Sequence, residues 1–441
     1  MSDLAGKNAV VLGLARSGEA AARALLDAGA TVTVLDAADD IPQRERAAQL
    51  AGARVLLGKT DPGDVAGADL VVASPGVAWS SPWIDAARAG GIPVWSEIEL
   101  AFRLGVRPLV GITGTNGKTT TTEMTVAALR AAGRAAIAAG NVGTPLVTFA
   151  SGTEIVAELS SFQLQGIEDF RVPVAVLLNV AHDHLDWHGS DDAYRRAKAR
   201  VFENQGETDV AIVHDDPLCR SIANGAATQI LFADDELPSG GAGIEDGWIV
   251  VPQGRVVDAG RMRARGRPNR SDAIAAAAAA CALGADPTTV GEALAAFEPR
   301  RHRIEQVAVI DDIAYINDSK ATDPHATLAA LEGMTGVVLI AGGRNKGIDL
   351  SELAVAAPHL RAVVAIGESA PEIDAAFAST GVPVEKAGSM EEAVARAREL
   401  ASAGDTVLLS PACASFDMFR NYEERGDAFR AAVRRIEGSD L

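Results

Sequence analysis

Cysteine is scarce in this sequence, which has three, Cys219, Cys281 and Cys413, in a chain of 441 residues. No two of them show the C-x-x-C spacing of a redox or metal-binding pair. Disulfide frameworks need paired cysteines and persist mainly in oxidising compartments. We therefore expect a fold without disulfides in a reducing compartment.

Basic residues are also in the minority, because 40 Lys and Arg stand against 59 Asp and Glu, a formal net charge of −19. A nucleic-acid surface needs clustered Lys and Arg to neutralise phosphates, so no nucleic-acid partner is expected. A small anionic ligand remains compatible with this charge, since a local basic patch can oppose the global field.

Long apolar runs are missing as well. The most apolar stretch, AIAAAAAACALGA at 273–285, is too short to span a bilayer and predicts a buried, alanine-rich helix. The opening MSDLAGKNAVVLG has no basic segment followed by a long apolar one, so no signal peptide is expected. These features favour a soluble cytoplasmic protein without membrane insertion.

Three successive series of strand and helix signals divide the chain. Short apolar runs alternate with helical stretches in each series, the pattern of βαβ units whose parallel sheet is covered by helices. The segment 239–268 is rich in Gly, Asp and Arg and predicts hairpins and loops. We therefore expect three α/β domains, at residues 1–104, 105–299 and 300–441.

A glycine-rich turn follows the first strand signal. The run Gly13-Leu14-Ala15-Arg16-Ser17-Gly18 is similar to the dinucleotide fingerprint, and Asp36 ends the next strand, where that fold grips a ribose. A nicotinamide cofactor is one interpretation, and the diphosphate of another nucleotide at the helix N-terminus is a second. A tight strand–helix turn without a ligand also fits this pattern.

The stretch GITGTNGKTT at 111–120 is a stronger signal, because it predicts a phosphate-binding loop between a strand and a helix. Lys118 would bring a positive charge to the β- and γ-phosphates, and Thr119 a hydroxyl to Mg²⁺. Ile112 occupies the first glycine position of the full G-x-x-x-x-G-K-[ST] pattern, so a chance turn is the alternative. Glu158 ends the strand TEIVAE, a position suited to a direct or indirect Mg²⁺ ligand.

Three of the seven histidines lie within NVAHDHLDWH at 179–188. The run nearly spells the H-x-H-x-D-H signature of a binuclear zinc hydrolase, but Trp187 stands where the last histidine belongs. His184 is still a candidate Mg²⁺ ligand or acid–base group. Lys198, in DAYRRAKARVF, is by itself an ordinary helix lysine. A lysine that combines with CO₂ becomes an anionic carbamate ligand, but spacing does not show this.

Several motifs occur together in one order: TGTNGKT, ELSSFQL, LNVAHDHLDWH, YRRAKARVF, RRHRIE, NDSKATDPHAT and LLSPACASFDMF. In this order they resemble the Mur ligases over nearly the whole chain, and the forms ELSSFQL and SPACASFDMF resemble the branch that adds D-glutamate. The resemblance implies a Rossmann-like first domain, a central P-loop ATPase-type domain and a Rossmann-like third domain. It also implies an ATP-dependent ligase that joins D-glutamate to UDP-N-acetylmuramoyl-L-alanine through an acyl phosphate. Such a protein would act as a monomer in cytoplasmic peptidoglycan precursor synthesis.

The resemblance further assigns residues to the substrates. The UDP-linked substrate, rather than NAD, would contact Arg16, Ser17, Asp36, Ala37, Gly76, Asn141, Ser160 and His184. ATP would contact Gly114, Thr115, Asn116, Gly117, Lys118, Thr119, Thr120, Asp272, Arg303 and Asp318. D-Glutamate would contact Thr322, Lys346, Ser415 and Tyr422.

The catalytic set that the resemblance implies is Lys118, Glu158, His184, Lys198 and Lys320. Two Mg²⁺ ions would be held by Thr119, Glu158, His184 and a carbamylated Lys198.

Some positions depart from the family pattern. Pro268 and Asp272 replace the His and the last Asn of a G-x-H-N-x-x-N turn, which leaves the adenine contacts there open. Tyr422 stands in place of a more familiar Phe, and Asp323 in place of Asn adds an acid near the glutamate site.

Other functions remain as alternatives. One is the same reaction with L-glutamate, and another is a folylpolyglutamate synthase or a different Mur ligase. The first domain and SPACASFDMF argue against a folate ligase. A nucleotide-binding switch without ligation and a metal-dependent hydrolase are the alternatives from other classes.

Overall fold

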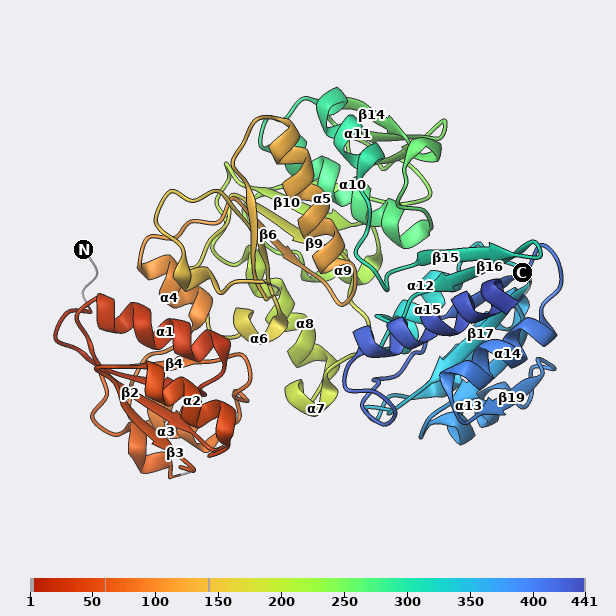
Figure 1. Ribbon diagram of the computed structural model, residues 1–441. Helices are drawn as coiled ribbons and strands as arrows, with labels where there is room; N and C mark the ends of the chain where they lie inside the picture. The colour runs from red at the N-terminus through yellow and green to blue at the C-terminus, as the bar shows by residue number, and fades with distance from the viewer. Residues whose placement is uncertain (1–3, 60, 142, 440–441) are drawn as a thin grey trace. The chain divides into compact units, whose positions relative to one another are not determined.

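The computed structural model describes residues 4–59, 61–141 and 143–439 and shows an α/β protein (Figure 1). Its chain falls into two compact units. The first contains the residues up to 180 with 187–261 and 272–295, and the second contains 181–186, 262–271 and the residues from 296. The boundaries of the three expected domains remain a prediction.

The first sheet of unit 1 is parallel and has the order β3-β2-β1-β4-β5. The middle strand β1 is an almost unbroken apolar run with Val11 and Leu12 fully buried, as expected where helices cover both faces of a parallel sheet. The strands are β1 (Asn8–Leu12), β2 (Thr31–Asp36), β3 (Arg54–Leu57), β4 (Leu70–Ala73) and β5 (Val94–Ser96). The helices are α1 (Arg16–Asp27), α2 (Ile41–Gln49), η1 (Pro62–Val65), α3 (Pro82–Ala89) and α4 (Glu97–Arg103).

The central sheet of unit 1 is also parallel, in the order β11-β10-β9-β6-β8-β7. Strand β6 lies between β9 and β8, so the loop after β6 opens at the carboxyl edge of the sheet, where α/β folds bind ligands. The strands are β6 (Val110–Thr113), β7 (Ile137–Gly140), β8 (Ile155–Glu158), β9 (Val174–Leu177), β10 (Val210–His214) and β11 (Thr228–Phe232). The helices are α5 (Lys118–Ala131), η2 (Leu146–Thr148), α6 (Ser161–Leu164), α8 (Asp191–Ala199), η3 (Arg200–Phe202) and α9 (Pro217–Ile222); α7 (Leu185–His188) joins the two units.

An antiparallel sheet follows, made of β12 (Gly243–Glu245), β13 (Trp248–Val251) and β14 (Gly254–Asp258), with η4 (Ala259–Arg261) after it. It confirms the hairpins predicted for 239–268. Residues 273–280 of helix α10 (Arg267–Ala282) are fully buried, as the sequence predicted, and α11 (Pro287–Ala296) follows. In the part of the chain that the structure describes, every helix is too short or too polar to traverse a bilayer.

The sheet of unit 2 has the order β15-β16-β20-β17-β18-β19. Strands β15 and β16 pair antiparallel through a turn in which Asp311 and Asp312 have φ of 52° and 61°, so 307–318 is a hairpin rather than part of a βαβ unit. The strands are β15 (Glu305–Ile310), β16 (Ile313–Asn317), β17 (Val337–Gly342), β18 (Leu360–Ile366), β19 (Val384–Ala387) and β20 (Thr406–Leu409). The helices are α12 (Pro324–Leu331), η5 (Leu350–His359), α13 (Ala370–Phe377), α14 (Met390–Leu400) and α15 (Tyr422–Ser439).

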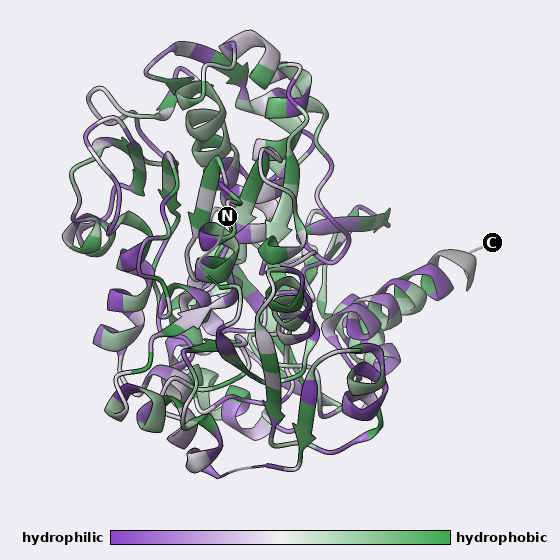
Figure 2. Ribbon diagram, turned by 90° about the vertical axis from the view of Figure 1, so that its left-hand side faces the viewer, coloured by the Kyte–Doolittle hydropathy of each residue, from purple (hydrophilic) through white to green (hydrophobic). Residues whose placement is uncertain are grey.

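Burial follows hydropathy in both units. Figure 2 shows apolar residues along the strands and a mixture of polar and apolar residues along outer helices such as α15. In unit 1 a single apolar cluster runs from Leu25 on α1 through Leu100 on α4 to Leu177 on β9, so the first and central sheets share one core. The three cysteines are buried and free, which confirms the expectation of a fold without disulfides.

Candidate active site

The first glycine-rich turn is held by an acid. Asp36, at the end of β2, accepts hydrogen bonds from the backbone N–H of Leu14 at 2.6 Å and of Ala38 at 2.8 Å. A Cβ on Gly18 would stand 1.9 Å from the Gly13 carbonyl oxygen, so α1 packs directly onto the turn. The carboxylate thus fixes the turn and still has lone pairs for a ligand. Of the other residues predicted here, Arg16, Ala37 and Gly76 are exposed and Ser17 is half-buried.

The predicted phosphate loop lies between β6 and α5 and needs both of its glycines. Gly114 has φ of 155° and Gly117 φ of 83°, regions that other residues rarely adopt. A Cβ would stand 2.9 Å from Leu178 Cβ at Gly114, and 2.2 Å from Asp272 Oδ1 at Gly117. Gly117 is the N-cap of α5, and no side chain caps that helix, so its first N–H groups face the loop. Backbone donors and a helix N-terminus together make an anion site.

A side chain that follows the neighbouring strand β9 bonds the backbone of the loop. Asn179, just after β9, accepts hydrogen bonds at Oδ1 from the N–H groups of Thr115 and Asn116, at 3.1 and 2.8 Å. Lys118 Nζ donates to the carbonyl oxygens of Gly114 at 2.8 Å and Thr115 at 2.7 Å. The ammonium group therefore lies over the loop, where a bound phosphate would need it.

The acid that ends β8 meets two of the predicted ligand residues. Glu158 is buried, and its Oε2 accepts from Thr119 Oγ1 at 2.8 Å while its Oε1 accepts from Asn141 Nδ2 at 2.8 Å. A carboxylate beside a threonine hydroxyl gives the oxygen ligands that Mg²⁺ prefers.

A magnesium ion at this pair would need further ligands from elsewhere. Among the described residues no group of three or more His, Cys, Asp or Glu gathers as a metal cluster. Mg²⁺ sites commonly use one or two carboxylates and complete their shell with phosphate oxygens and water. Thr119 and Glu158 therefore fit a magnesium–nucleotide complex at the loop.

Lys198 comes to the loop from α8. Its side chain is 1% exposed, and Nζ donates to the Gly114 carbonyl at 2.6 Å and lies 4.4 Å from the centroid of the Tyr194 ring. Tyr194, one turn earlier, has its hydroxyl 3.1 Å from Thr115 Oγ1. Helix α8 thus places two side chains on the phosphate loop, although the lysine itself looked ordinary in the sequence.

The motif ELSSFQL forms the start of α6. Ser160 is its N-cap in a capping box, in which Ser160 Oγ accepts from the Gln163 N–H at 3.2 Å and Gln163 Oε1 accepts from the Ser160 N–H at 3.0 Å. His188 Nε2 lies 3.0 Å from Ser161 Oγ, and its ring stacks on Phe162. Ser160 therefore sits at a rigid turn directly after β8 and Glu158.

His184 falls in the second unit, whereas Thr119, Glu158 and Lys198 fall in the first. It has a positive φ of 54°, and its Nε2 is 3.2 Å from Asp183 Oδ2. An aspartate beside the ring fixes its orientation. Its role as a magnesium ligand remains a prediction.

The motif RRHRIE precedes β15 and holds Arg303 in a constrained stretch. His302 and Ile304, on either side of Arg303, have positive φ values of 67° and 46°, and for a β-branched residue this is an unfavourable conformation. Their N–H groups donate to Glu305 Oε2 at 2.9 Å and to Asp318 Oδ1 at 3.2 Å. Strain of this kind persists where the surroundings over-determine it, commonly at ligand sites.

Asp318 is the buried acid of this region. Its Oδ2 accepts from Ser410 Oγ at 3.0 Å, and burial raises its pKa to about 7, although the hydrogen bonds from Ser410 and Ile304 oppose that rise. A carboxyl group with such a pKa is shared between neutral and charged forms near neutrality. It is suited to hydrogen bonding with a hydroxyl such as that of a ribose.

Lys320 and Tyr422 meet in unit 2. The Lys320 Nζ lies 4.0 Å from the centroid of the Tyr422 ring, and burial raises the pKa of Tyr422 to about 12, so its hydroxyl stays protonated. Arg425, on the same helix as Tyr422, is 1% exposed and donates to Ser319 Oγ at 3.0 Å and to the Cys413 carbonyl at 3.0 Å. This arginine joins NDSKATDP, SPACASFDMF and the start of α15.

The remaining predicted glutamate contacts differ in exposure. Ser415 is buried, Thr322 is half-buried, and Lys346 is exposed in the turn after β17. Asp323 is the N-cap of α12 and accepts from the Ala326 N–H at 2.9 Å, so the acid that replaces Asn serves as a helix cap.

Asp272, which replaces the last Asn of the family's G-x-H-N-x-x-N turn, accepts from Thr121 Oγ1 at 3.0 Å and lies against Gly117.

Sequence reasoning did not find Asn179, Tyr194 or Arg425. Asn179 opens the quoted run NVAHDHLDWH and Tyr194 the run YRRAKARVF, so both were visible as motif members but not as loop contacts.

Three family models match the chain in order: "Mur ligase MurD-like, N-terminal domain" at 7–96, "Mur ligase middle domain" at 112–239, and "Mur ligase, glutamate ligase domain" at 302–413. A Frankia casuarinae protein named UDP-N-acetylmuramoylalanine–D-glutamate ligase is 46% identical, over 98% of this chain and 95% of its own length. A Geobacillus kaustophilus protein of the same name is 40% identical, with 98% of both chains covered.

Solved structures agree on the fold. A pseudomurein peptide ligase type C from Methanothermus fervidus superimposes with a TM-score of 0.60 at 19% identity, covering 98% of this chain and 100% of its own. The UDP-N-acetylmuramate–alanine ligase MurC from Thermotoga maritima gives a TM-score of 0.57 at 19% identity, covering 98% and 99%. With its motifs, its matched domains and relatives alike over nearly the full length, the chain belongs to the Mur ligase family.

Proposed function

We propose that this protein uses ATP to join the amino group of D-glutamate to the terminal carboxylate of UDP-N-acetylmuramoyl-L-alanine, releasing ADP and phosphate. The observation that carries the proposal is the loop after β6, where Lys118 lies over the loop and the Thr119–Glu158 pair lies beside it. The relatives' names supply the substrates.

The first step activates an acid. A carboxylate oxygen of the L-alanine moiety attacks the γ-phosphorus, the bond from phosphorus to the bridging oxygen breaks, and ADP leaves with that electron pair. Both reactants are anions, so their repulsion must be offset at the loop. Lys118 and the N-terminal amides of α5 supply positive charge, and Thr119 with Glu158 would hold Mg²⁺, which neutralises phosphate charge.

The second step forms the amide. The neutral amine of D-glutamate attacks the carbonyl carbon of the acyl phosphate, its proton passes to a base, and the carbon–oxygen bond to phosphate breaks. Lys320 beside Tyr422 would stabilise the charge on the departing phosphate, and His184 is a candidate for the base. Exclusion of water matters here, because water competes with the amine for the acyl phosphate.

Lys198 is proposed to act as a carbamate. Its neutral Nζ attacks the carbon of CO₂, an electron pair moves onto one oxygen, and Nζ releases a proton to water. The product would supply an anionic oxygen that could bind magnesium beside the loop. Support comes from the buried position of Lys198 against Gly114.

The remaining predicted residues are proposed to contact the substrates. The UDP end is proposed to lie at the Asp36-supported turn, and the muramoyl part near Asn141 and Ser160. Arg303 and Asp318 would contact the nucleotide, while Thr322, Lys346, Ser415 and Tyr422 would contact D-glutamate, with Lys346 reaching its side-chain carboxylate. We further propose that the protein works as a monomer in the cytoplasm, where nucleotide-linked wall precursors and ATP are available.

A direct test supplies purified protein with ATP, Mg²⁺ and UDP-N-acetylmuramoyl-L-alanine, and compares D-glutamate, L-glutamate and D-aspartate. We expect phosphate release that requires both co-substrates, and an amide product with D-glutamate. Turnover with L-glutamate alone would change the proposed stereochemistry, and ATP hydrolysis without any amide product would overturn the ligase proposal. A second test replaces Lys198 with Ala and adds acetate, a small carboxylate that could take the place of the carbamate. Full activity of Lys198→Ala without acetate would remove the carbamate from the mechanism.

A further inference from the structure

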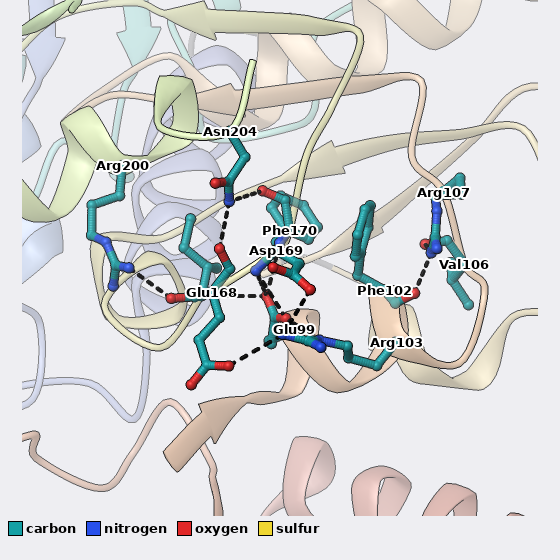
Figure 3. A network of polar contacts seen from close by, with 11 residues as sticks. Glu99, Phe102, Arg103, Val106, Arg107, Glu168, Asp169, Phe170, Arg200 and Asn204 are labelled. Atoms are coloured by element: carbon teal, nitrogen blue, oxygen red, sulfur yellow. Dashed lines mark hydrogen bonds and ion pairs between the residues drawn. The ribbon is translucent and has the colours of Figure 1, made fainter. Parts of the chain in front are cut away.

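The segment 164–170 begins at the last residue of α6 and precedes β9, and its backbone polar groups are bonded by three side chains from other parts of the chain (Figure 3). Glu99, on α4, accepts from the N–H groups of Glu168, Asp169 and Phe170 at 2.8 to 3.1 Å. Asn204 donates to the carbonyls of Glu168 at 2.7 Å and Phe170 at 3.0 Å. Arg200 bonds the carbonyls at the start of the segment.

Arg200 bonds three carbonyl oxygens of this segment. Its Nη1 donates to the carbonyl oxygens of Leu164 at 3.2 Å and Gln165 at 2.5 Å, and its Nη2 donates to that of Ile167 at 2.6 Å. Its Nε donates to Glu203 at 2.7 Å, which orients the planar group. Only a guanidinium has enough donors in a fixed plane to do this.

The position of Arg200 in the chain connects its hydrogen bonds with the segment 164–170 to the phosphate loop. It is the C-cap of α8, two residues after Lys198 and therefore about 3 Å further along the axis. The helix also contacts the phosphate loop, through Tyr194 against Thr115 and through Lys198 against Gly114. The C-terminal turn of α8 is thus held both by the loop, at Lys198, and by the segment 164–170, at Arg200.

We propose that Arg200 is a positioning residue, which sets the place of Lys198 by fixing the C-terminal end of α8 to the segment 164–170. The inference deepens the proposed function and rests on the proposed role of Lys198. Without the guanidinium, three carbonyl oxygens lose their donors, and α8 must shift or fray to let water reach them. A displacement of 1 Å at Lys198 is enough to disturb a metal ligand or phosphate contact.

The test is a double-mutant cycle on Arg200→Gln and Lys198→Ala, with kcat measured for amide formation under saturating substrates. We expect Arg200→Gln to lower kcat at least 10-fold in the parent protein, and less than 2-fold in the Lys198→Ala background, because the two residues act as one unit. Arg200→Lys should restore little, because a single ammonium cannot reproduce the planar fork.

Arg196→Gln is the matched control, since Arg196 is exposed on the same helix one turn earlier. It should leave kcat within 2-fold of the parent. A second readout follows the lysine directly: ¹³C NMR in ¹³C-bicarbonate should show a carbamate signal that Lys198→Ala removes. In Arg200→Gln that signal should need more bicarbonate to reach half of its intensity, whereas Arg196→Gln should match the parent.

Each result decides between the proposals. The positioning role would be overturned if Arg200→Gln lowered kcat by the same factor in the Lys198→Ala background as in the parent. It would also be overturned if the carbamate signal of Arg200→Gln showed the bicarbonate dependence of the parent. A Lys198→Ala protein with parental kcat would remove Lys198 from the reaction and this inference with it, yet leave the ligase proposal standing. A parent that makes no amide would instead overturn the ligase proposal itself.

Discussion

Glu99 offers the sharpest test of how unit 1 is held together, because it is fully buried and accepts hydrogen bonds from four charged or backbone donors. Three N–H groups of 168–170 and Arg103 Nε, at 2.7 Å, all donate to it. Glu99→Ala removes this acceptor from the buried N–H of Phe170 and from the part-buried N–H groups of Glu168 and Asp169, while Arg103 keeps its contacts with Glu168 and Asp169. Breaking a buried charge network of this kind costs about 3–5 kcal/mol, so we expect a loss of ~4 kcal/mol.

The measurement is calorimetric unfolding of the protein without substrates, with limited proteolysis around 164–173 as a local readout. A loss of ~4 kcal/mol corresponds to a fall in Tm of ~8 °C for a cooperative unit of this size. Glu99→Gln should lose somewhat less, because one amide oxygen still accepts while the NH₂ group faces the backbone donors.

Glu168→Gln is the matched control for Glu99. Its carboxylate is 3.2 Å from Arg103 Nη2, and its side chain is 47% exposed, so it belongs to the same network but lies at the surface. Exposed pairs contribute less than ~1 kcal/mol, so a change of no more than ~2 °C is expected. A Tm for Glu99→Ala within 2 °C of that of Glu168→Gln would refute the reasoning about buried acceptors.

The remaining predictions concern charge, loop geometry and specificity. Burial raises the pKa of Glu97 to about 7, so the folded state holds this proton more tightly than the unfolded chain does. The free energy of unfolding should therefore fall by on the order of 3 kcal/mol as pH rises from about 4.5 to 7. Glu97→Gln should abolish that part of the Tm–pH profile. Lys118→Ala should lower kcat by about 100-fold or more, measured by phosphate release, because the anionic reactants lose their cation. Gly117→Ala should raise the KM for ATP and lower kcat, because its Cβ would meet Asp272 at 2.2 Å; activity equal to the parent would contradict the loop geometry. Lys346→Ala should raise the KM for D-glutamate about 10-fold and leave the KM for ATP within 2-fold, and equal effects on both would place Lys346 elsewhere.

The parts of the fold that the sequence predicted are those with strong apolar runs between turn signals. Strands β1, β6, β8 and β17 are of this kind, and each lies inside its sheet. Strands β3, β7 and β19 lie at sheet edges and are only partly buried, so they need few apolar residues and carry little signal. The β15–β16 hairpin was also not predicted, because its turn is Asp311-Asp312 without the glycine that usually marks such turns.

The candidate site also has a part that the sequence could predict and a part that it could not. The loop, Thr119 and Glu158 are near one another in a motif-bearing βαβ unit, so local sequence was enough to bring them together. Asn179 and Arg425 act over 63 and 106 residues of chain, on Asn116 and Ser319 respectively, and only the folded sheets bring such pairs into contact. Lys198 is intermediate, since its motif pointed to it, but its burial against the loop is a property of α8 packing.

Asp272 shows how a departure from a family motif can be understood from packing. Its Oδ1 accepts from Thr121 on α5 and fills the space where a side chain at Gly117 would stand. A carboxylate oxygen accepts this hydrogen bond as well as an amide oxygen does, so replacement of Asn by Asp keeps the contact between α10 and α5. The same oxygen requires a glycine at the N-cap of α5, and the glycine in turn leaves the first N–H groups of the helix open to a phosphate. The loop therefore depends on a residue about 150 positions away in the chain.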